Sequence, residues 1–204
     1  MSTTSFDQIA IDKDIPGDID VLGISTSMKP GLGVEGVRSA TTNILRIVLN
    51  MASRNGLKAA MLDLRDVPIP LFDGRSIDQR PEKSCSVVME ALKSSGVLCC
   101  TVPAYWSGYS GVFKNFVDVV GGAHYDDENP VTLLSGKKLG LIVVGADQVS
   151  ADMAAGQAET TLAHIGAELI AQPISLTNPR RIPWDEAKVL KSFADLVSCF
   201  KQRG

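Results

Sequence analysis

The sequence predicts a doubly wound α/β domain, in which a five-stranded parallel sheet carries helices on both faces. Apolar runs bounded by turn residues alternate along the chain with segments whose apolar residues recur every three or four positions. These patterns are typical of strands and helices, and their alternation is typical of right-handed crossovers between parallel strands. Two of the apolar runs, 96–102 and 138–144, lack regular polar alternation, which indicates strands covered on both faces.

The predicted elements follow one another in strict alternation. The apolar runs place strands at 18–25, 57–64, 96–102, 138–144 and 168–174. The helical periodicity places helices at 40–55, 81–95, 110–120, 150–165 and 185–202. Together they predict one domain over 18–204, preceded by a polar tail over 1–17.

Turn residues set the boundaries of these elements. Asn55-Gly56 ends the first helix, and Pro81 begins the second because proline is tolerated in a first turn. Between them, prolines and a glycine predict a long loop after the second strand, at Pro68, Pro70 and Gly74. The next two helices end before glycines, at Gly121, Gly122 and Gly166.

Composition narrows the class of protein. The chain has 204 residues, is 45% hydrophobic and 21% charged, and carries a net charge of −3, as an ordinary globular domain does. This balance gives no support to nucleic-acid binding, which needs a basic surface for the phosphates. The acidic first twenty residues are unlike a secretory signal, and no apolar run is long enough to cross a bilayer. We therefore expect a cytoplasmic protein without a membrane or nucleic-acid partner.

The cysteines and histidines do not predict a metal site. The four cysteines lack zinc or iron–sulfur spacing and are interpreted as structural, at Cys85, Cys99, Cys100 and Cys199. His124 stands near Asp126 and Asp127, a cluster that is more typical of a solvated loop than of a metal centre.

The loop after the first strand contains two competing signals. Gly31, Gly33 and Gly36 match G-x-G-x-x-G, and Asp63 ends the second strand where a ribose-binding acid would lie. However, five residues separate Ser25 from Gly31, and the interval from Gly36 to Asp63 exceeds the usual distance of about 20 residues. The glycines therefore fit a loop insertion over 31–37 better than a dinucleotide fingerprint.

The second signal is a concentration of hydroxyl groups. They leave the first strand and open the first helix, at Ser25, Thr26, Ser27, Ser39, Thr41 and Thr42, and Asn43 follows them. A phosphate monoester is bound by short donors and by the free amides of a helix N-terminus, and Lys29 and Arg38 could add positive charge. The alternative is that these residues only form turns and a helix cap.

The loop after the third strand gathers aromatic side chains. Tyr105, Trp106 and Tyr109 lie within five positions, after a proline, Pro103, that we expect to fix the turn. Such a loop offers a wall or lid to a planar ligand. An aromatic cluster that plugs the end of the sheet, or a subunit interface, is the alternative.

A motif in this region carries a family resemblance. The pattern P-x-Y-x-x-x-Y-S-G-x-x-K-N-x-x-D over 103–118 resembles the NAD(P)H-dependent FMN reductase family. Residues 24–29, 67–73 and 136–146 are similar to that family's phosphate loop, its proline-rich loop and its fourth strand with the following turn. The resemblance implies a flavodoxin-like three-layer sandwich with strand order 2-1-3-4-5, and a homodimer or homotetramer.

The resemblance also implies FMN as cofactor, with NADPH or NADH as electron donor. The expected contacts to FMN are Ser25, Ser27, Lys29, Ser39, Thr41 and Thr42 for the phosphate, Pro103, Ala104, Tyr105 and Trp106 for the ring, and Gly145, Ala146 and Asp147 for its pyrimidine edge. The chain departs from the family at Ala104 and Trp106, where many members carry Glu and Asn, and at the insertion 31–37. Asp147, if it points inward, would disfavour negative charge on the ring.

The function that follows is an FMN-dependent NAD(P)H oxidoreductase. It would pass electrons, by ping-pong hydride transfer, to free flavin, a quinone or another small acceptor. We expect no catalytic side chain, because the flavin carries the chemistry. The alternatives are a flavodoxin-type electron carrier and a nucleotide-binding regulatory protein without hydride activity.

Overall fold

A parallel sheet forms the centre of the computed structural model, which describes residues 18–29, 39–128, 131–178, 180 and 185–201. Its main strands, in spatial order, are β2 (Ala59–Asp63), β1 (Ile19–Ser25), β3 (Ser95–Tyr105) and β5 (Lys138–Gly145). Two short strands, β6 (Glu168–Leu169) and β7 (Ile174–Thr177), both pair with β5 in parallel. This order confirms the predicted arrangement 2-1-3-4-5, with β6 and β7 together as the fifth position.

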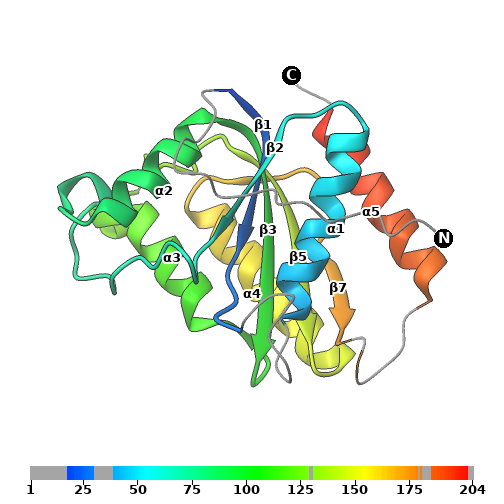
Figure 1. Ribbon diagram of the computed structural model, residues 1–204. Coiled ribbons are helices and arrows are strands. Elements are labelled where there is room, and N and C mark those ends of the chain that lie inside the picture. The colour runs from blue at the N-terminus through cyan, green and yellow to red at the C-terminus, as the bar shows by residue number, and fades with distance from the viewer. Residues whose placement is uncertain (1–17, 30–38, 129–130, 179, 181–184, 202–204) are drawn as a thin grey trace.

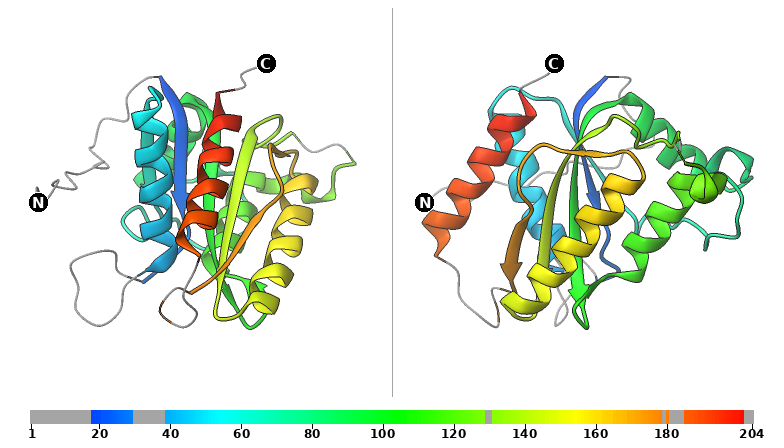
Figure 2. Two further views of the ribbon diagram at one scale, coloured as in Figure 1. Left: turned by 90° about the vertical axis from the view of Figure 1, so that its right-hand side faces the viewer. Right: turned by 180° about the vertical axis from the view of Figure 1, so that it is seen from behind.

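Helices cover both faces of the sheet, as predicted (Figures 1 and 2). On one face lie α1 (Ala40–Arg54) and α5 (Glu186–Phe200), and on the other lie α2 (Lys83–Ser94), α3 (Gly111–Gly121) and α4 (Gln148–His164). Two short 3-10 helices, η1 (Ile77–Gln79) and η2 (Gly122–Asp126), lie in the connections on the second face. The three-layer sandwich is therefore confirmed.

The central strands owe their place to apolar side chains on both faces. In β3, Leu98 and Cys100 pack into the core under α2, α3 and α4, whereas Val97 and Cys99 pack under α1 and α5. All four side chains are buried. Removing apolar surface from water stabilises a protein by about 25 cal/mol per Å². A strand with apolar side chains on both faces is therefore most stable where helices cover both faces of the sheet.

The predicted fifth strand, 168–174, is corrected to two pieces. Leu139 of β5 pairs with Leu169, but Ile142 pairs with Ile174, so two residues of β5 face four residues between β6 and β7. Pro173 lies in that interruption and has no N–H to offer the sheet. Pairing resumes at β7, which extends the edge of the sheet to Thr177.

The third strand is also longer than predicted. β3 continues to Tyr105 and turns back into β4 (Gly108–Tyr109), a short antiparallel strand that the sequence did not indicate. Pro103 therefore lies within β3, paired with Val144, and does not form the turn as we expected. A proline fits there because pairing between β1 and β3 ends at Thr101, which leaves that side of β3 without a neighbouring strand.

The cysteines are free thiols within the packed protein. Cys85, Cys99 and Cys100 are buried, and Cys199 is half-buried. Burial raises the pKa of Cys99 to about 12, so its thiol stays protonated at neutral pH. Burial also raises the pKa of Cys85 and Cys100, so these three thiols are poor nucleophiles and act as small apolar side chains.

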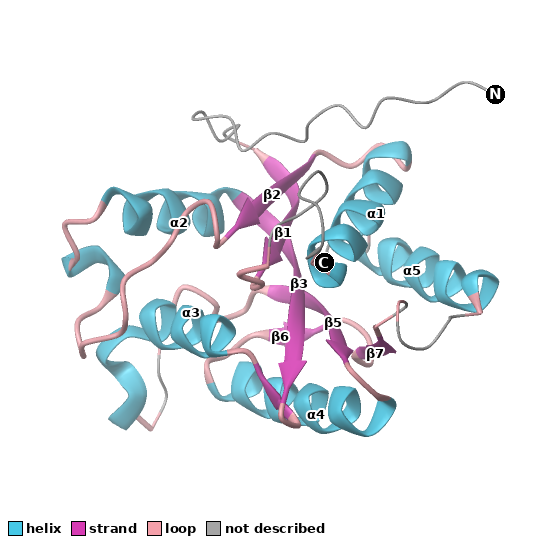
Figure 3. Ribbon diagram, turned by 60° about the horizontal axis from the view of Figure 1, so that its bottom comes forward, coloured by secondary structure: helices cyan, strands magenta, loops and turns pink. Residues whose placement is uncertain are grey.

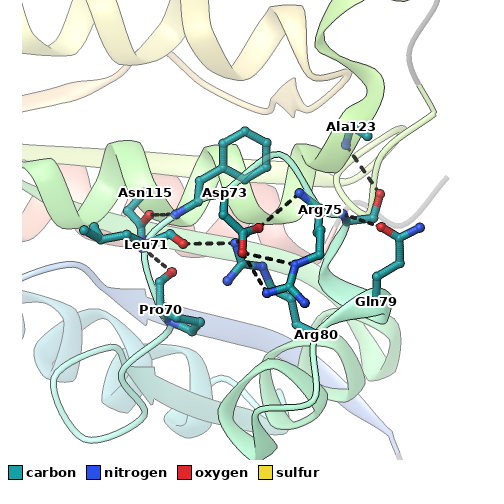
Figure 4. A network of polar contacts seen from close by, with 10 residues as sticks. Pro70, Leu71, Asp73, Arg75, Gln79, Arg80, Asn115 and Ala123 are labelled. Atoms are coloured by element: carbon teal, nitrogen blue, oxygen red, sulfur yellow. Dashed lines mark hydrogen bonds and ion pairs between the residues drawn. The ribbon is translucent and has the colours of Figure 1, made fainter.

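The loop between β2 and α2 is held to the body by a polar network (Figure 4). The Asn115 side chain on α3 donates to the Pro70 carbonyl oxygen at 3.0 Å and accepts from the Phe72 amide at 2.8 Å. The buried Arg80 guanidinium donates to the Leu71 carbonyl oxygen at 3.0 Å and to an Asp73 carboxylate oxygen at 2.8 Å. Asn115 and Arg80 therefore fix the path of the proline-rich segment beside α3.

We expect Asn115→Ala to lower the free energy of unfolding by about 1–3 kcal/mol, because it leaves two partly buried backbone groups of the loop without partners. Chemical denaturation measures this change. The neighbouring variant Lys114→Ala removes an exposed ion pair with Asp118 and should change stability by less than about 1 kcal/mol. Equal effects of the two variants would contradict the role given to Asn115.

Asp73 gives the same network a pH dependence. The side chain of Arg75 donates to the Asp73 carboxylate and lowers its pKa to about 2. A depressed pKa means that the stabilisation is complete above the unfolded value near 4 and is lost as the pH falls through about 2. We expect NMR titration of the Asp73 side-chain carboxyl to show it ionised at pH 4; a midpoint at or above 4 would contradict the pairing.

Candidate functional site

The polar residues singled out in the sequence lie at one edge of the sheet. β1, β3 and β5 are parallel neighbours, so their carboxyl ends meet at the edge that faces forward in Figure 3. In the register of the sheet, Ser25 of β1 pairs with Thr101 of β3, which in turn pairs with Ile142 of β5. In open α/β sheets ligands bind outside this edge, so the loops leaving these three strands form the candidate site.

The first part of the site is a buried cluster of hydroxyl groups. The hydroxyls of Ser25 on β1 and Thr42 on α1 lie 2.8 Å apart. Ser39 caps α1, accepting from the Thr42 amide at 3.1 Å and from the Thr42 hydroxyl at 2.8 Å. The Thr41 hydroxyl lies 2.9 Å from that of Ser39. The strand end and the helix start therefore share one hydrogen-bonded network of donors.

A row of polar side chains runs across the sheet beside this cluster. Asp63, Ser25 and Thr101 occupy paired positions on β2, β1 and β3 and are all buried. Burial raises the pKa of Asp63, so its carboxyl is a weaker acid than that of a free aspartate. Among the described residues, the Thr101 hydroxyl has no hydrogen-bond partner, and neither does the side-chain oxygen of Asn43 on α1.

These two buried atoms suggest that the cluster is incomplete without a ligand. A buried hydroxyl without a partner costs about 1–3 kcal/mol, so native proteins seldom leave one. The helix N-terminus above the cluster adds amide groups and a positive dipole end. Short donors, a helix start and an unused hydroxyl are the donor set that a phosphate monoester requires, and the residues present therefore fit the phosphate of FMN.

The segment after β1 leads from this cluster toward the aromatic residues. Ser27 is buried and its hydroxyl accepts from the Lys29 amide at 3.2 Å, which forms a tight turn. The Lys29 ammonium lies 5.4 Å from the centre of the Tyr105 ring, within the range of a cation–π contact. Lys29 and Tyr105 therefore link the first loop to the end of β3. Arg38 and the insertion 31–37 lie outside the described residues.

The second part of the site is the hairpin between β3 and β4. Tyr105 pairs with Gly108, which leaves Trp106 and Ser107 as a two-residue turn. Both turn residues have positive φ, 53° and 62°, a conformation that hairpins of this type usually give to Asn-Gly. A side chain larger than glycine in this region is strained by about 1–3 kcal/mol at each position. Strain of this kind clusters at functional sites.

The third part is the turn from β5 into α4. A Cβ atom on Gly145 would lie 2.8 Å from the Ala151 amide nitrogen and 2.9 Å from the Asp147 carbonyl oxygen, so only glycine fits. Asp147 caps α4, accepting from the Ser150 amide at 2.8 Å and from the Ser150 hydroxyl at 3.0 Å. Ala146 is exposed beside them. The carboxylate of Asp147 therefore serves the helix start.

The structure brings most, but not all, of the expected residues together. Hydroxyls from β1 and α1 are in contact, and the hairpin and the β5–α4 turn are adjacent, because the Ser107 hydroxyl lies 3.5 Å from that of Ser150. Pro103 and Ala104 are buried in β3, and their side chains form part of its packing. Tyr109 turns away from the edge, packing on Phe113 and lying 3.3 Å from the Thr161 hydroxyl.

Sequence reasoning missed one member of the site and could not place another. Thr101 was read only as part of an apolar run, although a threonine at the end of a buried strand is a signal for a polar contact. Gln157 of α4, whose side-chain amide lies 3.4 Å from the Ser107 carbonyl oxygen, has no local motif that would mark it.

In the part of the chain that the structure describes, no three His, Cys, Asp or Glu side chains gather closely enough to hold a metal ion. None of the helices described combines the length and the apolar character needed to cross a membrane.

A parallel sheet of this order, with helices on both faces, defines a flavodoxin-like fold. More particularly, the chain belongs to the NADPH-dependent FMN reductase family, whose sequence model matches residues 19–178. Membership makes the protein an FMN-dependent NAD(P)H oxidoreductase, with FMN as cofactor and NAD(P)H as electron donor. No curated protein sequence matches the chain.

Solved structures with the same fold include oxidoreductases and a flavodoxin. An NADH:FMN oxidoreductase named EMOB, in its apo form, is 16% identical, with a TM-score of 0.64 over 88% of this chain and 87% of its own. FerB, an NAD(P)H:(acceptor) oxidoreductase from Paracoccus denitrificans, is 17% identical, with a TM-score of 0.64 over 88% and 93%. A flavodoxin from Pseudomonas aeruginosa is 14% identical, with a TM-score of 0.53 over 89% and 98%.

Proposed function

We propose that the protein holds FMN at the carboxyl edge of the sheet and uses NAD(P)H to reduce a second, small-molecule acceptor in a ping-pong cycle. The observation that carries this proposal is the joint presence, on one edge, of the buried hydroxyl cluster at β1 and α1 and the aromatic hairpin after β3. Membership of the family gives FMN as the cofactor. The hydroxyl cluster would hold the phosphate of FMN, and the hairpin would lie beside its ring.

The phosphate would be held by residues of the first loop and the first helix. Ser27, Ser39 and Thr42 are buried hydroxyl groups that can turn their protons toward an anion without moving the backbone. Lys29 would supply positive charge, and Ser25 and Thr41 would hold the other hydroxyls in place through their present contacts. Backbone amides at the start of α1 complete the donor set.

The ring would lie against the end of β3 and the β5–α4 turn. FMN bound here would supply the hydride and electron transfer, so the protein itself would need no acid or base for it. Tyr105 would offer an aromatic surface, and the Lys29 ammonium lies over its ring, 5.4 Å from the ring centre. The backbone at Gly145 and Ala146 can approach the polar edge of the ring closely because Gly145 carries no side chain. Asp147 would remain the cap of α4.

Exposed aromatic side chains at this edge favour a ping-pong order of binding. Trp106 and Tyr105 are exposed among the residues that the structure describes. A single open site here would serve the nicotinamide and then the acceptor, so NAD(P)⁺ would have to leave before the acceptor binds. Parallel lines in a double-reciprocal plot, with NADPH varied at several acceptor concentrations, are the expected pattern, whereas converging lines would indicate a ternary complex.

The test of the proposed function is anaerobic reduction of the FMN-loaded protein. NADPH or NADH should abolish the visible absorbance of the bound flavin, and menadione added afterwards should restore it. A protein that binds FMN but is not reduced by either nucleotide would instead be an electron carrier. Absence of FMN binding would overturn the assignment of the hydroxyl cluster and favour a nucleotide-binding role.

A further inference from the structure

Trp106 combines a strained backbone with a side chain that the protein does not bury. Its φ of 53° lies in the left-handed region, where a bulky residue is a conformational outlier. Its exposure is 101%, so the indole gains nothing from packing, although indoles are among the largest apolar groups that proteins bury. Neither its backbone nor its side chain stabilises the fold, which points to a role in contacting something outside the chain.

Helix α4 holds the turn in this conformation. The Gln157 side-chain amide lies 3.4 Å from the Ser107 carbonyl oxygen, and the Ser150 hydroxyl lies 3.5 Å from that of Ser107. A third contact joins the Tyr109 hydroxyl to that of Thr161 at 3.3 Å. The position of the Trp106 backbone is therefore set by the body of the protein, and its ring is presented from a fixed point.

An exposed methionine lies beside the same turn. Ser150, Met153 and Gln157 are spaced three and four residues apart, so they share one face of α4, and the first and last of them contact Ser107. Met153, between them, is therefore on the side of α4 that faces the hairpin, and it is half-exposed. Thioether and indole groups are both polarizable and favour flat aromatic partners.

We propose that Trp106, with Met153 beside it, is a stacking platform that selects planar aromatic electron acceptors, such as quinones, for the second half of the reaction. The proposal rests on the proposed function and adds the class of acceptor to it. Its place fits, because the turn projects from the end of β3, next to Tyr105, whose ring already has Lys29 over it. Among the described residues at the end of this strand, Trp106 therefore presents the most exposed aromatic side chain.

The overall reaction with a quinone transfers one hydride and one proton. NAD(P)H supplies a hydride, and solvent supplies one proton. Together they convert a quinone into its dihydroxy form, with NAD(P)⁺ as the other product. Two electrons move in total, and the platform takes no part in the transfer; it holds the acceptor flat at the exposed edge of the site.

The test compares Trp106→Asn, which fits the left-handed turn but lacks a ring, with Trp106→Phe, which keeps a ring. NADPH-dependent reduction is measured with menadione, a planar quinone, and with ferricyanide, which has no aromatic surface. We expect Trp106→Asn to raise the KM for menadione about ten-fold, which corresponds to the loss of about one aromatic stacking contact. The KM for ferricyanide should rise less. Trp106→Phe should recover most of the loss. Val131→Ala, at an exposed position that precedes β5, should change neither value.

Two measurements do not depend on turnover. Menadione should quench tryptophan fluorescence of the oxidised, FMN-loaded protein in a saturable way, and Trp106→Phe should abolish that saturable part. Trp106→Asn should also raise the melting temperature by about 2–4 °C, because asparagine adopts the turn conformation with less strain.

Three results would overturn the platform. Equal increases in KM for menadione and ferricyanide, or a weaker FMN affinity in Trp106→Asn, would place the indole ring of Trp106 in the flavin site. A change of oligomeric state in Trp106→Asn, seen by sedimentation, would show that a second copy of the chain covers it. Failure of the wild-type protein to reduce either acceptor would refute the proposed function itself. The ratio of the KM changes for menadione and ferricyanide tests only the platform.

Discussion

Ser27→Asp should weaken FMN binding by about 100-fold or more, equivalent to about 2.8 kcal/mol. Ser27 is buried at the turn after β1, between the hydroxyl cluster and Lys29. A carboxylate there would face the phosphate at short range, and two like charges about 4 Å apart in a partly buried site repel by about 4 kcal/mol. Isothermal titration of the flavin-free protein with FMN measures the change.

The control for this variant uses the flavin itself. Riboflavin has the same ring but no phosphate, so its affinity should be similar in Ser27→Asp and in the wild type. Ser27→Ala, which fits the space without a charge, should weaken FMN by about ten-fold through loss of one hydrogen bond to a charged group. Equal losses for riboflavin and FMN would show that Ser27 lies away from the phosphate.

Gly145→Ala should lower the free energy of unfolding by about 1–3 kcal/mol and also weaken FMN binding. The added methyl group would lie 2.8 Å from the Ala151 amide nitrogen and 2.9 Å from the Asp147 carbonyl oxygen. These are backbone atoms of the β5–α4 turn, which cannot move aside as a flexible side chain can. The turn must therefore open, and the edge that we propose for the polar end of the ring would shift with it.

Gly156→Ala is the matched control, because it makes the same change within α4, the helix that follows the Gly145 turn. Gly156 is exposed on α4, and an added Cβ would meet no atom within 4 Å. Alanine is favoured over glycine inside a helix by about 1 kcal/mol, so this variant should be more stable than the wild type. Chemical denaturation of both variants decides the matter; a Gly145→Ala protein as stable as the wild type would contradict the close turn.

The sequence was most informative about the strands and helices with a strong periodicity. β3 and β5 were located because continuous apolar runs indicate strands covered on both faces, and α1 because its apolar residues share one face. β4 was missed because two residues, Gly108 and Tyr109, are too short to show a period. The break before Ile174 depends on pairing with β5, a long-range contact that local patterns do not contain.

The candidate site was predictable to the extent that topology alone decides it. Parallel strands end at a common edge, so hydroxyls after β1 and aromatics after β3 had to lie near one another. The direction of individual side chains was not predictable. Tyr109 contacts Thr161 of α4, and Pro103 pairs with Val144 of β5; both partners are distant in sequence. Asp147 caps α4 through Ser150, three residues further on, and this local contact keeps its carboxylate at the helix start.

We propose that this edge of the sheet binds a flavin through its phosphate. Titrating the flavin-free wild-type protein with FMN and with riboflavin, and following the quenching of flavin fluorescence, tests it most directly. We expect one FMN site per chain and an affinity for riboflavin that is weaker by about 100-fold, since riboflavin forms none of the phosphate contacts. Equal affinities for the two flavins, or no binding of either, would contradict it.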